Sequence, residues 1–173
     1  LRLFKGYVAQ GGIQVPAVIK LPGETVNQGA RTNQLTHVVD LMPTFLSVAG
    51  VTYPDTFHGE QIVPLQGESL IPALSGDSTA SSDARELGWS AYGMDAYRRG
   101  DWKALRLPEP YGSGDWQLYN LAADPGEMRD LASEFPKIVK ELAAAWERYA
   151  EANGVIQPGT TTAYAKPVVG KKY

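Results

Sequence analysis

The chain has 173 residues, of which 43% are hydrophobic and 20% are charged, and its net charge at pH 7 is −3. This length suits one ordinary domain or one lobe of a larger protein, and the composition is typical of a globular protein. The small negative charge argues against a general polyanion-binding surface, so we expect no nucleic-acid partner. The chain has no cysteine, which excludes disulfides, thiolate metal sites and a cysteine nucleophile within these residues.

No stretch approaches the ~18 apolar residues of a membrane span, and no signal-peptide pattern is visible, so we expect no membrane partner. The chain starts at Leu1 and not at a methionine. We interpret it as a fragment or a processed C-terminal piece. A fragment trimmed for expression and an incomplete gene model are the alternatives. The lack of cysteine fits the cytoplasm or the periplasm equally, which leaves the compartment open.

The first predicted element is a strand. Residues 13–21, "IQVPAVIKL", alternate and then run apolar, which predicts a buried strand with Pro16 near its start. Residues 22–34 are rich in Gly and Asn and predict a loop. Gly11 and Gly12, just before the strand, would allow a close backbone approach or form a bulge, and we favour the bulge.

Residues 35–50 predict a helix that ends at Gly50 and has Thr36 as a candidate N-cap. Helical spacing gives this segment one apolar face, formed by Val38, Leu41, Met42, Phe45, Leu46 and Ala49. Pro43 is unfavourable in mid-helix, because it removes a hydrogen bond. We therefore expect either a kink or a helix that starts at Asp40–Pro43 with Asp40 as its cap.

The C-terminal half predicts a small α+β lobe, in which one helix packs on an antiparallel sheet. Residues 51–86 look mostly irregular and end in a polar connection that we take as the boundary between lobes. From residue 87, two strands joined by a turn at Arg99-Gly100-Asp101 are expected, followed by a third strand over 115–121.

The closing helix is the strongest pattern in the chain. We expect it to be capped by Ser133, to carry Pro136 in its first turn and to end at Gly154. One face would hold Val139, Leu142, Trp146 and Tyr149. Residues 155–173 show little periodicity and predict an extended tail.

Four segments in order resemble the C-terminal part of a sulfatase, in the alkaline-phosphatase-like superfamily. "FKGYVAQGGIQVPAVI" resembles a lysine followed by an "(E/Q)GG-x-R/Q-VP" strand, and "THVVDLMPTFLSVAG" resembles the family's "D-L-x-PT-L-L-x-x-AG" helix. "GESLIPALSG" resembles its "G-x-SL-x-P-L-x-G" loop. "RRGDWKAL" and "WQLYNLAADPGEMRDLA" resemble "R-x-G-x-WK" and "ELYDLxxDPxExxNLA". The pattern is most similar to bacterial arylsulfatases.

The resemblance implies an α/β, alkaline-phosphatase-like fragment. Residues 1–80 would be the C-terminal part of the catalytic lobe, 81–154 the α+β lobe and 155–173 the tail. Because the strand at 13–21 would lack flanking strands, we expect residues 1–80 to be poorly ordered in isolation, whereas 87–153 would fold as a unit.

The resemblance also implies hydrolysis of a small sulfate ester by a formylglycine, made from a Cys or Ser in "C/S-x-P/A-x-R", beside a Ca²⁺ ion. Fixed positive charge would stabilise the charge that develops on the ester oxygens. No such motif occurs here, since neither Ser69 nor Ser90 is followed by the required Pro/Ala and Arg spacing. The nucleophile and the metal ligands are therefore expected in an N-terminal remainder of the same polypeptide.

One active-site position matches the family pattern. Lys5 aligns with the lysine that contacts the substrate sulfate, and its ammonium would bind a sulfate oxygen and help to polarise the leaving-group oxygen. A solvated surface lysine is the alternative. His58 lies in a loop that would reach the pocket rim, so we name it as a candidate substrate contact. His37 is interpreted as a capping or packing residue.

The aromatic residues admit two interpretations. They would form a sugar-stacking surface or the packing between helix and sheet, and their spacing favours packing, with Tyr111 as the expected exposed exception. Three functions remain open: a sulfatase portion that is inactive alone, a non-catalytic accessory lobe, and a related phosphate or phosphonate ester hydrolase.

Overall fold

The computed structural model describes residues 1–21, 29–76 and 85–157. It divides into two compact units: Leu1–Ala17 with Asp83–Tyr173 form unit 1, and Val18–Ser82 form unit 2. Within the described ranges, no helix is both long and apolar enough to cross a membrane. The domain boundaries expected from the sequence stay a prediction, and most of the expected tail, residues 158–173, lies outside the described residues.

Unit 1 contains a four-stranded antiparallel sheet in which chain neighbours are also sheet neighbours. Its strands are β3 (Glu86–Ala91), β4 (Met94–Arg99), β5 (Trp102–Arg106) and β6 (Trp116–Asn120). The predicted turn at Arg99–Asp101 and the predicted third strand are confirmed. The expectation of only two strands before it is wrong, because Tyr92 and Gly93 have positive φ angles of 53° and 73°. These angles suit a two-residue hairpin turn, which separates β3 from β4.

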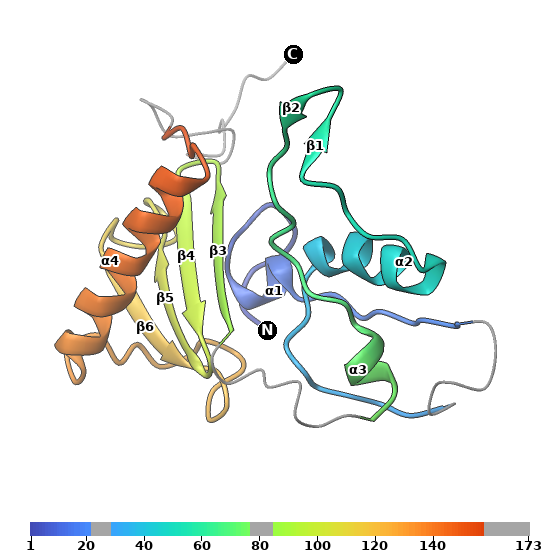
Figure 1. Ribbon diagram of the computed structural model, residues 1–173. Coiled ribbons are helices and arrows are strands. Elements are labelled where there is room, and N and C mark those ends of the chain that lie inside the picture. Colours follow the sequence, from blue (N-terminus) through green and yellow to red (C-terminus); the bar gives the residue numbers. More distant parts are fainter. Residues whose placement is uncertain (22–28, 77–84, 158–173) are drawn as a thin grey trace, which may run out of the picture. The chain divides into compact units, whose positions relative to one another are not determined.

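Both faces of this sheet are buried, so its strands alternate between two cores. Helix α4 (Pro136–Ala152) lies along one face (Figure 1), and its core comprises Tyr97, Ala104, Leu118, Leu142, Ala145 and Trp146. Residues from the N-terminal loop cover the other face, in a core of Tyr7, Val8, Ala9, Met94, Ala96, Leu105, Leu107, Tyr119 and Leu121. Most of the aromatic side chains therefore pack between elements, as predicted. Tyr111, expected to be exposed, instead packs edge-on against Tyr7 with ring centroids 4.8 Å apart.

Helix α4 confirms the strongest sequence pattern. Leu142 and Trp146 are each 2% exposed, and Gly154 has a φ of 61° just past the helix end. The predicted Ser133 cap is wrong, because the N-cap position is Phe135 and no side chain caps the helix. A turn in which the Phe135 N–H donates to the Leu131 carbonyl separates Ser133 from the helix start.

The predicted strand at residues 13–21 is wrong. Ile13 ends a one-turn helix, α1 (Gln10–Ile13), and the residues after it pair with no strand; Val15 and Val18 are 77% and 99% exposed. A strand needs a partner strand for its hydrogen bonds, and no strand of the described structure pairs with this segment. The favoured bulge is also wrong. Gly11 permits a close approach, since a Cβ there would lie 2.1 Å from the Leu3 carbonyl oxygen.

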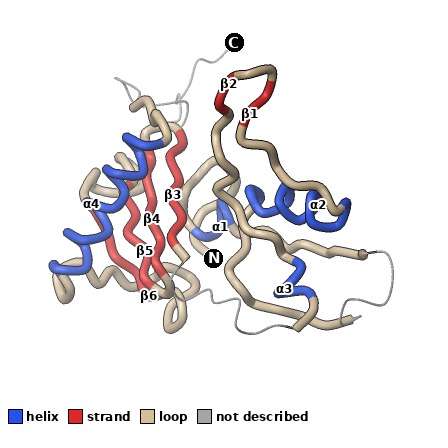
Figure 2. The backbone as a smooth tube through the Cα atoms, viewed as in Figure 1, coloured by secondary structure: helices blue, strands red, loops and turns tan. Residues whose placement is uncertain are grey.

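Unit 2 is mostly loop (Figure 2), in agreement with the irregular pattern of its second half. Its elements are the 3-10 turn η1 (Val38–Asp40), α2 (Leu41–Ala49), β1 (Thr56–Phe57), β2 (Glu60–Gln61) and α3 (Ile71–Leu74). Helix α2 starts directly after Asp40 with Pro43 in its first turn, and it ends at Gly50 (φ 65°), as expected. Thr36 caps neither element: the N-cap position of α2 is Asp40, and His37 caps η1 by accepting from the Val39 N–H, which confirms the capping interpretation of His37.

The interior of unit 2 includes two polar side chains beside Leu70. Asp40 and Thr44 are 0% and 2% exposed; the Asp40 carboxylate accepts from the backbone N–H groups of His37 and Glu68, at 2.7 and 3.0 Å. The Leu70 N–H donates to the Thr44 hydroxyl oxygen at 2.8 Å. The apolar face of α2 instead points outward, with Phe45 61% exposed. A helix with its polar side buried and its apolar side exposed leaves a hydrophobic surface uncovered within this chain.

Candidate functional site

Lys5, the site residue predicted from the sequence, lies at the tip of an N-terminal loop in unit 1. It occupies a turn with Gly6, whose φ is 93°, and its side chain is exposed. Across the described parts of the chain, its ammonium group forms no hydrogen bond and no ion pair. The group is therefore free to meet an anion from solvent, which is compatible with the predicted role and also with a solvated lysine.

The backbone on both sides of Lys5 is fixed to unit 1. At the base of the loop, the Gly11 N–H donates to the Arg2 carbonyl oxygen at 2.8 Å. Within the loop, Val8 is 2% exposed and packs into the sheet core. Lys5 is thus an exposed side chain on an anchored backbone, a suitable arrangement for presenting a charge at a defined place.

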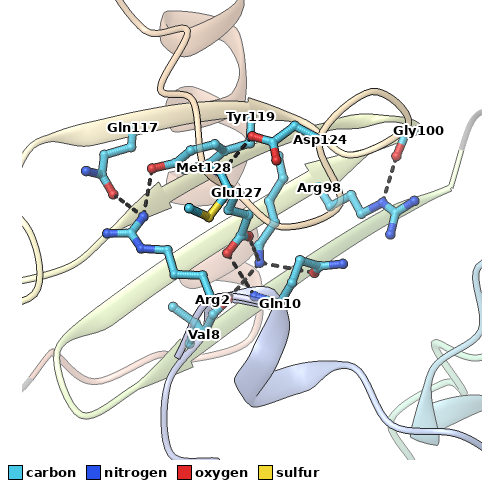
Figure 3. Close-up of polar contacts among 11 residues, drawn as sticks. Arg2, Val8, Gln10, Arg98, Gly100, Gln117, Tyr119, Asp124, Glu127 and Met128 are labelled. Atoms are coloured by element: carbon cyan, nitrogen blue, oxygen red, sulfur yellow. Dashed lines mark hydrogen bonds and ion pairs between the residues drawn. The ribbon is translucent and has the colours of Figure 1, made fainter. Parts of the chain in front are cut away.

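Beneath this loop lies a fully buried ion pair between Lys103 of β5 and Glu127, with both side chains at 0% exposure. The Lys103 Nζ donates to Glu127 Oε1 at 2.7 Å, to the Val8 carbonyl oxygen at 2.8 Å and to Gln10 Oε1 at 3.3 Å. The second carboxylate oxygen of Glu127 accepts from the Gln10 N–H at 2.9 Å (Figure 3). Burial lowers the pKa of Lys103 to about 8, although Glu127 opposes this shift.

All three protons of the Lys103 ammonium are used in this arrangement, so it has none left for a substrate. Arg2 is held in a similar way at the start of the loop. Its guanidinium donates to Gln117 Oε1, to the Tyr119 hydroxyl and to the Tyr111 carbonyl, at 3.1, 2.7 and 3.0 Å. Burial raises the pKa of Tyr119 to about 12, so its hydroxyl stays protonated at neutral pH. Both cations attach the loop to the sheet.

His58, the second candidate, lies in unit 2 at the turn between β1 and β2. It is exposed, its φ is 52°, and its ring meets that of Phe57 edge-on with centroids 4.1 Å apart. Lys5 and His58 thus belong to different units, and their joint presence at one site stays a prediction.

The described residues do not fit a Ca²⁺ site. Nowhere in 1–21, 29–76 or 85–157 do three His, Cys, Asp or Glu side chains gather as metal ligands. The two buried aspartates are already engaged: Asp40 accepts from backbone N–H groups, and Asp95 accepts from Arg106 at 2.6 Å and from Ser90 at 2.9 Å.

Sequence reasoning missed the Lys103–Glu127 pair. Both residues stand in the segments that carry the family resemblance, "GDWKAL" and "ADPGEM", but nothing in these segments indicates that the two side chains pair. A signal was available for Lys103. Lys103 and Leu105 are two positions apart in a strand, so their side chains point to the same face. A lysine on a buried face needs an acidic partner.

The family models and the curated proteins both relate this chain to the C-terminal portion of sulfatases. Residues 3–81 match the family model described as N-sulphoglucosamine sulphohydrolase, C-terminal. An uncharacterized sulfatase of Schizosaccharomyces pombe is 33% identical over 90% of this chain and 28% of its own length. Arylsulfatase K of Xenopus laevis is 28% identical over 82% of this chain and 26% of its own length.

Among solved structures, Ps i-CgsB superposes with a TM-score of 0.54 at 23% identity, over 74% of this chain and 26% of that one. This likeness concerns the fold alone. The chain spans about a quarter of the length of the relatives that it matches.

Proposed function

Since this chain is homologous to sulfatases over their C-terminal portion, we propose that it forms this portion of an enzyme that hydrolyses small sulfate esters, and that Lys5 binds the sulfate group. The observation that supports the proposal is the placement of Lys5. It lies within the segment matched by the family model, on a loop whose backbone is fixed and with a side chain that is exposed. An alkaline-phosphatase-like catalytic lobe would include residues 1–80.

The proposed role of Lys5 is electrostatic. Negative charge lies on the non-bridging oxygens of a sulfate ester and grows on the leaving oxygen as the S–O bond breaks. An ammonium at hydrogen-bond distance from these oxygens stabilises the transition state, and a charge-assisted bond of this kind contributes roughly 1.5–3 kcal/mol. His58 would contact another part of the substrate.

The remaining parts of the site would come from the N-terminal remainder of the polypeptide. These are the formylglycine nucleophile and the oxygen ligands of a Ca²⁺ ion, which would polarise the sulfate. The outward apolar face of α2 supports this partner, since a larger lobe would cover Phe45 and its neighbours. This chain alone is expected to be inactive.

The test is an assay of the complete enzyme with a chromogenic aryl sulfate and the matching aryl phosphate. We expect cleavage of the sulfate, and Lys5→Ala should lower kcat/KM for it about 10- to 150-fold, which corresponds to the loss of one charge-assisted bond. Lys140→Ala, which removes an exposed lysine of α4, is the matched control and should leave kcat/KM unchanged.

Two results would overturn the proposal. Faster cleavage of the aryl phosphate would assign the protein to phosphate or phosphonate ester hydrolysis. Unchanged sulfate turnover in Lys5→Ala would mean that Lys5 is a solvated surface lysine. This chain would then be a non-catalytic accessory lobe.

A further inference from the structure

Four hydrogen bonds involve the buried Lys103–Glu127 pair: three join it to the loop that carries Lys5, and one joins its two members (Figure 3). Two of them run from Lys103 to loop residues, one runs from Lys103 to Glu127, and the fourth runs from the Gln10 N–H back to Glu127. Together they form a closed ring of donors and acceptors with no exposed side chain. The ring connects β5 and the loop after β6 to residues 8–10 of the N-terminal loop.

Burial of an ion pair carries a large desolvation free energy. Desolvation of two charges offsets most of their attraction, so two apolar side chains of similar volume would lose little of the pair's own electrostatic contribution. They would, however, leave the Val8 carbonyl and the Gln10 N–H buried without partners. The ion pair instead fixes the geometry of the loop, because each of its bonds to the loop holds one backbone or side-chain atom in place.

The fixed atoms lie close to Lys5 along the chain. Val8 follows Lys5 by three residues, and the bond between Gly11 and Arg2 closes the loop behind it. Substitution at Gly12 is also blocked, since a Cβ there would lie 2.1 Å from the Tyr7 carbonyl oxygen. Among the described residues, the Lys5 ammonium has no hydrogen bond or ion pair to hold it. Its position therefore depends on the backbone, which the ion pair helps to hold.

We propose that Lys103 and Glu127 are positioning residues for Lys5: they set the place of its ammonium group in the sulfate-binding site without touching the substrate. This inference rests on the proposed function of Lys5. A displacement of about 1 Å at a reacting centre costs up to about 100-fold in rate, so loosening the loop should reduce turnover strongly.

The test uses the complete enzyme with an aryl sulfate and the variants Glu127→Gln, Lys5→Ala and the two combined. Glutamine keeps the shape of Glu127 but replaces one oxygen with an NH₂ group, which cannot accept from Lys103 or from Gln10. We expect Glu127→Gln to lower kcat/KM about 10- to 100-fold. Because Glu127 acts through Lys5, the double variant should lie within about twofold of Lys5→Ala alone. Glu134→Gln, which removes an exposed ion pair with Arg129, is the matched control and should not change kcat/KM.

Hydrogen exchange supplies a readout that is independent of turnover. In Glu127→Gln the Gln10 amide should exchange at least about 10-fold faster, while the amides of α4 keep their protection. If Glu127→Gln does not fold, Gln10→Met replaces it. Gln10→Met removes one bond to Lys103, and we expect a loss of about 3- to 10-fold with the same non-additivity toward Lys5→Ala.

The outcomes separate the two proposals. Wild-type turnover in Glu127→Gln, or losses that multiply in the double variant, would overturn the positioning role while a strong effect of Lys5→Ala keeps the proposed function. If Lys5→Ala is fully active but Glu127→Gln is impaired, the proposed function of Lys5 fails and the positioning role fails with it.

Discussion

The two units of this chain differ in the side chains that they bury and in those that they expose. Unit 1 buries apolar side chains on both faces of its sheet and places one charged pair at 0% exposure between sheet and loop. Unit 2 buries Asp40 and Thr44 and turns the apolar face of α2 outward. A unit with an apolar interior on both sides of a sheet can fold on its own, whereas a unit with an outward apolar helix depends on something to cover it.

The largest effect is expected at Trp146, at the centre of the α4 core. Its ring is 2% exposed and packs against Trp116 and Arg106, and its Nε1 donates to the Trp89 carbonyl at 3.3 Å. Trp146→Ala should lower the free energy of unfolding of unit 1 by about 3–5 kcal/mol. Urea denaturation of the 173-residue chain followed by circular dichroism measures this. Met128→Ala, at an 83% exposed side chain, is the control and should change stability by less than about 0.5 kcal/mol.

Unit 2 should respond most strongly at a polar residue. Asp40→Ala leaves the N–H groups of His37 and Glu68 without their acceptor, and we expect a cost of about 2–4 kcal/mol. Amide exchange at Glu68 reports the local loss, and Asp55→Ala, at an exposed aspartate, is the matched control. Protection of Glu68 that is unchanged in Asp40→Ala would show that the polar interior does not stabilise unit 2.

The pH dependence of stability should distinguish the units, because only unit 1 holds a buried lysine among the described residues. The pKa of Lys103 is lowered to about 8 in the folded chain from 10.5, so the unfolded state binds more protons between these values. Stability should therefore rise from pH 8 toward pH 10, by up to about 3 kcal/mol. Above pH 10 the raised pKa values of Tyr97 and Tyr119 act in the opposite direction, since the folded state then holds more protons.

Denaturation of unit 1 at pH 8, 9 and 10 measures the rise, and Lys103→Met should abolish it. A rise that persists in Lys103→Met would assign the pH dependence to other groups.

The sequence predicted those features of both units that depend on neighbours within a few turns of chain. The α4 face, the turn at Arg99–Asp101 and the stop at Gly50 are set by local spacing and by glycine's access to positive φ, and the structure confirms them. The strand at residues 13–21 was wrong because an apolar run becomes a strand only beside another strand.

The candidate site was only partly visible in the sequence. Lys5 was found through its motif, and the structure adds the anchored loop around it. The Lys103–Glu127 pair was missed because Lys103 meets Glu127 24 positions along the chain and the Val8 carbonyl 95 positions away. No periodicity connects residues at such separations, and only the fold of the sheet brings them together.

The smallest effect in the isolated chain is expected at Phe45, and it bears most directly on the comparison of the units. Phe45 is 61% exposed, so Phe45→Ala should change the stability of this chain by less than about 0.5 kcal/mol. In the complete enzyme the same ring would be covered by the larger lobe, and its removal should cost about 1–3 kcal/mol. Parallel thermal or urea denaturation of the isolated chain and of the complete enzyme measures the difference. Equal small effects in both would mean that the apolar face of α2 stays open to solvent, and the exposed helix would then need an explanation other than the missing three quarters of the relatives' length.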